Sequence, residues 1–376
     1  MFLLDSAPQN LWTSVREAEL RLCSALATRN VLPLLVLTGD YPDDMSDRYR
    51  SAGALVFSTG CVPGEHPIRY YREIGKLIRR FRPRLVHIDH FSYFSSVPWM
   101  ARLHGVRKIV YLESNSGALR ARSWKRLLLR LRTAVMTWPI TRMIAISEFI
   151  RRRLIEVGVP LDKIEVIYNG VDTRRFTPDP EARQSWIERF QLRPDDLILS
   201  SVAFSHRFKH PEVIVEAIAH LAKRGIAAHL FIAGEGEMQA EAEALARSLG
   251  IGNYIHWLGD FSSPETLLQA SDIFILASVG EAFGYVLTEA MACGTPVVGS
   301  RSGAIGEVVE DGETGLLATP LDSVSFADAI ERLARDDQLR HDMGARGIDR
   351  VREMFTAETM IEKTVVLYGS LSGVLS

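Results

Sequence analysis

Two glutamates, Glu281 and Glu289, flank a glycine turn and form the clearest chemical pattern in this sequence. The residues before the turn, 272–278, are apolar and rich in strand formers, which predicts a short buried strand. The residues after it, 286–293, combine apolar and helix-forming side chains, which predicts a helix that begins beside Gly284. The pattern therefore predicts a helix N-terminus with one carboxylate before it and a second carboxylate within it.

The start of this helix is a predicted anion site. The backbone N–H groups of Gly284, Tyr285 and Val286 would have no partner inside the helix, and Gly284 has no side chain that would hold a phosphate away. Glu289 lies five residues further on, about 7.5 Å along the helix axis. This spacing suits a diphosphate at the helix start, a ribose hydroxyl at Glu289 and a sugar beside Glu281. A carboxylate among apolar neighbours also needs a partner or a ligand, because an unpaired buried charge is costly.

The composition of the 376-residue chain fits a cytoplasmic protein with two hydrophobic cores. Its hydrophobic content is 47% and its net charge is -2, which argues against a dedicated nucleic-acid-binding protein. The three cysteines, Cys23, Cys61 and Cys293, are isolated, which favours a reducing compartment and argues against a structural zinc site. The N-terminus lacks the features of a signal peptide, and no apolar run has the length of a transmembrane helix. We therefore expect a cytoplasmic location, with contact to a membrane surface still open.

Short apolar segments alternate with helical segments along the chain. The predicted strands are residues 32–38, 54–58, 85–88, 108–112, 143–147, 163–168, 197–203, 228–234, 254–259, 272–278 and 296–300. The predicted helices are residues 14–29, 67–81, 93–104, 123–136, 148–157, 211–224, 237–249, 264–270, 285–292, 305–310, 323–335 and 338–354. The alternation predicts an α/β architecture with parallel sheets, and the number of strands favours two doubly wound domains over a single sheet.

The order of parts in residues 278–321 resembles the donor-sugar half of the retaining glycosyltransferases of family 4. The segment contains a Glu-x-Phe-Gly turn with Phe283, a helix with Glu289 and the run CGTPVVGS. A glycine-rich loop, Glu307 and the hairpin sequence DGETG follow. The resemblance implies the GT-B fold, in which two Rossmann-like, doubly wound domains face a central cleft.

Further segments support a division of the chain into two domains. Residues 147–159 and 161–172 resemble the last helix, strand and Asn-Gly-Val-Asp turn of the family's first domain, and a proline-containing stretch follows them. We expect an acceptor-binding domain of residues 1–175, completed by a C-terminal helix in residues 356–376. Residues 176–355 would form the domain that binds the nucleotide-sugar donor.

The resemblance assigns donor contacts to the ends of several strands. Lys209 falls on the family's lysine that grips the donor diphosphate. Phe204 stands where the family usually has an arginine, so we expect Arg207 to supply that charge. Gly234 would shape the wall of the donor pocket, and the backbone at Leu258 would face the nucleotide base.

The sequence predicts transfer without a metal or another cofactor. A nucleoside diphosphate leaves with negative charge building on its bridging oxygen, and many enzymes stabilise that charge with a metal held by a D-x-D motif. This sequence contains no D-x-D motif. Lys209, Arg207 and the helix start at Gly284 would supply the positive charge instead. The glycine-rich loop 302–304 is predicted to offer further backbone amides at the same sheet edge.

The acceptor side carries fewer signals. His87 and His90 lie where a predicted strand ends, and the family often has histidines there, which makes both residues candidate acceptor contacts. Many members carry another histidine after the next strand. This chain has Glu113, Ser114 and Asn115 at that place, and Asn115 is the candidate sugar contact.

Residues 120–138 predict a contact with an anionic membrane surface. Apolar side chains recur at helical spacing from Trp124 to Val135, and cations such as Lys125 and Arg130 surround them. This pattern suits a helix that lies on anionic lipid. The alternative is an ordinary surface helix that packs on its own domain.

The residues and the resemblance together predict a retaining, metal-independent glycosyltransferase of the hexosyltransferase class. Its catalytic residues would be Glu281, Lys209 and Arg207, and retention is implied by the resemblance alone. It would move a hexose-type sugar from a UDP- or GDP-linked donor to a hydroxyl of a glycan or lipid-linked acceptor, in cell-surface polysaccharide or glycolipid synthesis. We expect it in the cytoplasm or on the inner face of the cell membrane. The alternatives are a nucleotide-sugar epimerase on the same fold and a non-catalytic GT-B binding protein.

Overall fold

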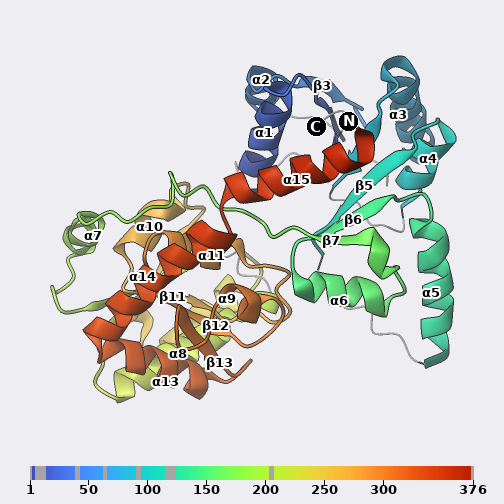
Figure 1. Cartoon of the computed structure of the whole chain (residues 1–376). Coiled ribbons are helices and arrows are strands. Elements are labelled where there is room, and N and C mark those ends of the chain that lie inside the picture. Colours follow the sequence, from blue (N-terminus) through green and yellow to red (C-terminus); the bar gives the residue numbers. More distant parts are fainter. Residues whose placement is uncertain are drawn as a thin grey trace. The chain divides into compact units, whose positions relative to one another are not determined.

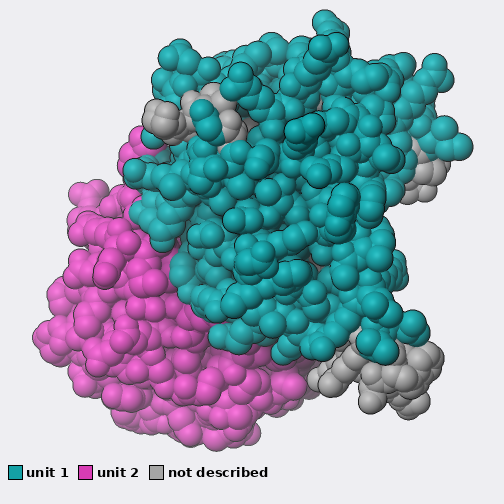
Figure 2. Space-filling model, turned by 45° about the vertical axis from the view of Figure 1, so that its right-hand side comes forward, with its two compact units in different colours: residues 1–170, 358–376 teal, residues 171–357 magenta. Residues whose placement is uncertain are grey.

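The computed structural model describes residues 2–4, 14–38, 43–61, 66–89, 95–115, 123–202 and 207–373. The chain forms two compact units, which Figure 2 shows in different colours. Unit 1 comprises residues 1–170 and 358–376, and unit 2 comprises residues 171–357. The sequence placed these boundaries at 175/176 and 355/356, a few residues away.

Unit 1 is built on a parallel sheet with the strand order β3-β2-β1-β4-β5-β6-β7 (Figure 1). Its strands are β1 (Phe2–Leu4), β2 (Leu34–Leu37), β3 (Leu55–Ser58), β4 (Leu85–Ile88), β5 (Lys108–Glu113), β6 (Arg142–Ala145) and β7 (Ile164–Val166). Its helices are α1 (Ser14–Ala27), α2 (Asp43–Ser51), α3 (Pro67–Phe81), α4 (Val97–Leu103), α5 (Ser123–Thr137), α6 (Glu148–Glu156), the 3-10 turn η1 (Leu161–Lys163) and α15 (Ala357–Ser372). Helix α15 packs into the core of this unit through Val365, Leu367 and Tyr368.

Unit 2 is built on a second parallel sheet with the strand order β10-β9-β8-β11-β12-β13. Its strands are β8 (Leu197–Val202), β9 (Ala228–Ala233), β10 (Ile255–Gly259), β11 (Ile273–Leu276), β12 (Val297–Ser300) and β13 (Gly315–Ala318). Its helices are α7 (Ala182–Phe190), α8 (Pro211–Lys223), α9 (Gln239–Ser248), α10 (Pro264–Ala270), α11 (Tyr285–Ala292), α12 (Ile305–Val308), α13 (Ser323–Ala334) and α14 (Asp337–Met354). Two 3-10 turns, η2 (Arg207–Lys209) and η3 (Gly252–Tyr254), complete it.

The predicted α/β architecture with parallel sheets is confirmed. Among the described residues, two strands, β1 and β13, and two α-helices, α2 and α7, were not predicted, nor were the three 3-10 turns. Most residues of α2 are charged, so its two buried apolar side chains, Met45 and Tyr49, form only a weak pattern in the sequence. Helix α7 follows the proline-containing stretch that was interpreted as the division between the domains. Among the described residues, none of the helices has the length and apolar character needed to cross a membrane.

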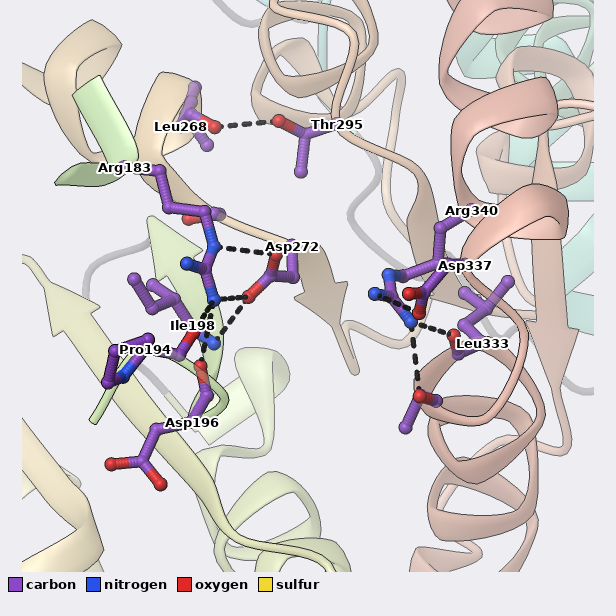
Figure 3. A network of polar contacts seen from close by, with 12 residues as sticks. Arg183, Pro194, Asp196, Ile198, Leu268, Asp272, Thr295, Leu333, Asp337 and Arg340 are labelled. Carbon is purple, nitrogen blue, oxygen red and sulfur yellow. Dashed lines mark hydrogen bonds and ion pairs between the residues drawn. The ribbon is translucent and has the colours of Figure 1, made fainter. Parts of the chain in front are cut away.

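Arg183 of α7 ties this helix to the beginnings of β8 and β11 (Figure 3). Its Nε donates to Asp272 Oδ1 at 3.1 Å, and its Nη2 donates to the carbonyl oxygen of Asp196 at 3.0 Å. Asp272 Oδ2 also accepts the backbone N–H of Ile198 at 2.8 Å. One guanidinium and one carboxylate thereby hold the starts of two neighbouring strands in a fixed relation.

A pair of half-buried histidines lies near the starts of β9 and β10. His229 Nδ1 lies 3.0 Å from His256 Nε2, and His229 Nε2 lies 3.5 Å from Asp196 Oδ2. The ring of His256 also stacks on Phe231, with the ring centroids 4.4 Å apart. Burial lowers the pKa of both histidines, and the neighbouring His229 lowers the pKa of His256 further. Asp196 offsets part of this effect on the pKa of His229.

The substitution His256→Phe is expected to make unit 2 less sensitive to acid. Both histidines have folded-state pKa values below the ordinary 6.5. The free energy of unfolding of unit 2 therefore has its full value above that pH and decreases as the pH falls toward the folded-state pKa values. Phenylalanine keeps the stack on Phe231 but takes up no proton. Urea unfolding at about pH 7.5 and about pH 5.5 should show a smaller loss in the variant than in the wild type. The exposed His341→Gln serves as the control, and an equal loss in all three proteins would contradict the prediction.

Candidate functional site

The two central strands of unit 2, β8 and β11, are neighbours in the sheet although they lie far apart in the chain. From β8 the chain continues to β9 on one side of the sheet order, and from β11 it continues to β12 on the other side. In open α/β sheets, ligands bind beyond the carboxyl ends of the strands at such a reversal. The loops that follow β8 and β11 meet there, since Val279 N–H donates to the Phe208 carbonyl at 3.0 Å.

An ion pair joins the same two loops. Lys209 Nζ lies 2.8 Å from Glu281 Oε2, and the side chains are 17% and 15% exposed. The sequence assigned a diphosphate to Lys209 and a sugar to Glu281, and it did not indicate that the two side chains would pair. Because both are largely buried, solvent and salt screen this pair less than a surface pair. The reversal therefore holds a fixed cation and a fixed anion side by side.

The turn that carries Glu281 is braced by the loop after β12. Ala304 N–H donates to the Glu281 carbonyl at 2.8 Å, and Gly280 N–H donates to Ser302 Oγ at 3.0 Å. A Cβ at Gly303 would lie 2.4 Å from the Glu281 carbonyl oxygen, so the backbone approach requires glycine. The prediction that this loop offers its amides to a ligand is wrong for Ala304 and Ser302, because both N–H groups bond within the protein.

Gly284 forms the N-cap of α11 with a φ of 93°. Leu287 N–H donates to the Gly284 carbonyl at 3.0 Å and opens the hydrogen-bond series of the helix, so the N–H groups of Tyr285 and Val286 lie ahead of it. Glu289 lies within α11 and is 5% exposed. The structure thus contains the predicted combination of a glycine turn, a helix start and a buried glutamate.

Phe283 anchors the turn between Glu281 and Gly284. Its side chain is buried, and its ring lies 5.7 Å from the ring of Phe355 in edge-to-face geometry. The ring of Tyr285 lies 5.6 Å from it on the helix side. Phe283 was predicted as a donor contact. In the structure, its packing against Phe355 and Tyr285 holds the turn of Glu281 in place.

Three further predicted donor residues lie at the neighbouring strand ends. Gly234 has a φ of 109°, and its N–H donates to the Gly259 carbonyl at 2.7 Å, which links the ends of β9 and β10. Leu258 lies where the pairing of these two strands shifts register. Arg207 is exposed, and its backbone N–H donates to Glu237 Oε1 at 3.3 Å. All three lie at the carboxyl edge of the sheet, the edge that carries Lys209.

His210, directly after Lys209, is a feature that the sequence did not indicate. It adopts a left-handed conformation with φ 49° and ψ 56° at the N-cap of α8, which is costly for a residue with a side chain. Its Nδ1 lies 2.8 Å from Glu212 Oε1. Phe204, which replaces the usual arginine of the family, lies outside the described residues.

The acceptor-side candidates in unit 1 have different surroundings. His87 is 4% exposed, and its Nδ1 contacts the Tyr368 hydroxyl of α15, which favours a packing role. Asn115 follows β5, and its backbone N–H donates to Glu113 Oε1 at 2.8 Å. His90 lies outside the described residues.

Glu113 is a buried carboxyl at the carboxyl edge of the unit 1 sheet. Burial raises the pKa of Glu113 to about 7, the N–H of Asn115 lowers it in part, and the nearby Asp89 raises it. The carboxyl is therefore partly protonated near neutral pH. The sequence indicated this residue only as a replacement for the family's histidine, because its burial depends on the surrounding strands.

Two family descriptions match the chain. Glycosyltransferase Family 4 matches residues 20–175, and Glycosyl transferases group 1 matches residues 183–350. The chain belongs to glycosyltransferase family 4. The first match lies almost wholly in unit 1 and the second in unit 2, so both units of the chain have counterparts in the family.

The curated relatives are similar to this chain over part of their length. The chain is 30% identical over 224 residues to N-acetyl-alpha-D-glucosaminyl L-malate synthase of Bacillus anthracis, with 60% of this chain and 58% of the relative covered. It is 34% identical over 218 residues to D-inositol 3-phosphate glycosyltransferase of Corynebacterium diphtheriae, with 55% and 51% covered. The chain thus spans little more than half the length of the curated relatives it matches.

Solved structures confirm the predicted GT-B fold. The structure matches a glycosyltransferase from Rickettsia africae with a TM-score of 0.82 at 19% identity, covering 98% of both chains. It matches Anabaena Alr3699/HepE in complex with UDP and glucose with a TM-score of 0.80 at 18% identity, covering 98% and 99%. At these identities the similarity concerns the fold alone.

The substitution Gly303→Ala is expected to disturb the turn of Glu281. The added Cβ would lie 2.4 Å from a backbone oxygen, and the φ of 62° adds strain, so we expect a loss of about 2–4 kcal/mol of stability in unit 2. The control is Gly312→Ala, since Gly312 has a φ of 85° but open space around its Cβ position. Urea unfolding of both variants separates the contact from the strain. Equal losses of stability in the two variants would show that the close contact with the Glu281 backbone does not contribute to the effect.

Proposed function

We propose that this family 4 protein is an enzyme that transfers a hexose-type sugar from a nucleotide-sugar donor to a hydroxyl acceptor, with retention of configuration. One observation carries the proposal. The Lys209–Glu281 pair lies at the strand reversal of unit 2, next to the N-terminus of α11. Ligands of open α/β sheets bind at this place, and a helix N-terminus there favours a diphosphate.

Each donor part matches one group of the site. Lys209 and the first N–H groups of α11 face the charge of a diphosphate, Glu289 accepts hydrogen bonds from the ribose, and Glu281 accepts them from the transferred sugar. Arg207 adds a cation at the exposed rim. UDP is the first donor nucleotide to test, because the solved relative from Anabaena was crystallised with UDP and glucose.

In the proposed reaction the bond between the sugar's anomeric carbon and the bridging phosphate oxygen breaks. The acceptor oxygen forms the new bond on the same face, and its proton passes to an oxygen of the departing diphosphate. Negative charge grows on the diphosphate during this step, so Lys209 and the helix start stabilise the transition state more than the bound donor.

The acceptor is proposed to be a glycan or a lipid-linked hydroxyl compound in cell-surface polysaccharide or glycolipid synthesis. The enzyme would act in the cytoplasm or on the inner face of the membrane, where nucleotide sugars are available. Two curated relatives carry names that refer to L-malate and to D-inositol 3-phosphate. These two small hydroxyl compounds are therefore included among the acceptors to be tested. A panel of UDP- and GDP-sugars with these acceptors should yield a glycoside and a nucleoside diphosphate. Epimerised donor, or no turnover with any pair, would contradict the proposal.

The substitution Glu289→Ala is expected to weaken binding of the nucleoside diphosphate by about 1.5–3 kcal/mol, roughly 10- to 150-fold, because a hydrogen bond to a charged acceptor is lost. Glu289→Gln keeps the shape of the side chain and should lose less. Isothermal titration calorimetry measures both affinities. Unchanged affinity in a folded Glu289→Ala variant would contradict the proposal that Glu289 binds the ribose.

The substitution Lys209→Met is expected to lower kcat far more than it raises the dissociation constant of the donor. Its charge acts on a diphosphate that becomes more negative in the transition state. Steady-state kinetics and calorimetry on the same preparation separate the two effects, with the exposed Lys223→Met as the control. A raised KM with unchanged kcat would make Lys209 a tether for the donor.

Activity is expected to survive EDTA, because Lys209 and the N-terminus of α11 supply the positive charge. In the part of the chain that the structure describes, no group of three or more His, Cys, Asp and Glu side chains is placed to hold a metal ion. Initial rates are compared in buffer, in EDTA, and in EDTA with excess Mg²⁺ or Mn²⁺. Loss of turnover in EDTA and recovery with either metal would refute metal-independent transfer.

A further inference from the structure

One region of unit 1 is strongly cationic although the chain as a whole has a net charge of -2. Residues 66–147 contain 17 Lys and Arg but only three acidic residues, Glu73, Asp89 and Glu113. Asp89 and Glu113 are buried, and Glu73 pairs with Lys76 at 2.7 Å. The surface of this region therefore has almost no negative charge to balance its cations.

Helices α3, α4 and α5 form this region, and Figure 1 shows them along one side of unit 1. Helix α4 contacts both of the others. Helix α3 presents cations at the three- and four-residue spacing of a single helix face, while Tyr70, Ile74 and Ile78 fill its buried side. The exposed cations of α3 are Arg69, Arg72, Lys76, Arg79 and Arg80.

Helix α5 adds an exposed apolar row. Leu127, Leu131 and Val135 follow one another at four-residue spacing and are 65%, 57% and 58% exposed. Trp138, just after the helix, is 59% exposed and stacks on Trp99 with the rings 5.4 Å apart and an interplanar angle of 16°. Large apolar side chains in an exposed row mark a surface that binds a partner.

The other side of α5 is attached to its own unit. Lys163 Nζ donates to the carbonyl oxygens of Thr137 and Trp138 at 3.0 and 3.3 Å. A Cβ at Gly158 would lie 2.9 Å from Arg130 Cγ, so the two segments approach closely. The exposed row is thus the outward face of a docked helix, which decides against the interpretation of α5 as a helix whose apolar row packs on its own domain.

We propose that α3, α4 and α5 form a docking surface for an anionic lipid bilayer. The cations of α3 would attract the headgroups, and the apolar row of α5 with Trp138 would enter the interface. A nucleic acid offers no apolar phase for this row, and a second copy of the chain would bring cations against cations. The inference deepens the proposed function, because it names the surface on which a lipid-linked acceptor would be met. Lipid binding itself needs no sugar transfer.

The test is co-sedimentation of the full chain with vesicles of phosphatidylglycerol and phosphatidylcholine, or of phosphatidylcholine alone, without donor. Binding is expected only to the anionic vesicles and should weaken as salt rises from about 0.05 to about 0.5 M. The triple variant Arg69→Glu, Arg72→Glu, Arg79→Glu should bind at least about 100-fold more weakly, since each surface cation contributes about 1 kcal/mol. Its matched control places the same charge change on unit 2, at Lys223, Arg247 and Arg352.

A second variant tests the apolar row. Leu131→Gln with Val135→Gln should lower the binding that survives at high salt, whereas the control Leu321→Gln with Val324→Gln should not. Circular dichroism confirms that each variant is folded. The proposal is overturned by absent binding at low salt, by equal losses in the controls, or by a dimer in sedimentation velocity that Leu131→Gln with Val135→Gln converts to a monomer. Lipid binding without sugar transfer would instead count against the proposed function alone.

Discussion

The structure of unit 2 depends on one constraint: β8 and β11 pair side by side, yet the chain leaves them toward opposite edges of the sheet. Arg183 and Asp272 hold the two strands together where they begin. Where they end, the loops that follow them meet, and Lys209 pairs with Glu281 there. The position of the candidate site therefore follows from this reversal of the strand order, and the side chains there determine which ligand it suits.

The sequence predicted those parts of the site that lie within one short segment. The turn at Gly284, the start of α11 and the buried Glu289 all follow from local spacing and hydrophobic pattern. The contact of Lys209 with Glu281 could not be predicted in this way, because 72 residues separate them and only strand pairing brings them together. The left-handed backbone of His210 was equally hidden, since residue type does not report a positive φ.

The same distinction explains the fold. Most strands and helices were predicted because apolar runs and periodicity identify them. Most residues of α2 are charged, and β13 begins within the sequence DGETG that was interpreted as a hairpin. The net charge of -2 correctly describes the chain as a whole and conceals the cationic region of residues 66–147. Whether α5 turns its apolar row inward or outward depended on contacts such as those of Lys163, which lie outside the helix itself.

The Lys209–Glu281 pair also has a consequence for the order of events in the proposed reaction. In that proposal, an intact donor would engage both residues, the lysine through its diphosphate and the glutamate through its sugar. After transfer, the nucleoside diphosphate would engage only the lysine, and the freed carboxylate, 2.8 Å from the lysine in this structure, would compete for the same ammonium group. The carboxylate of Glu281 would thereby displace the product nucleotide from Lys209 but leave the bound donor in place, which would favour product release over product inhibition.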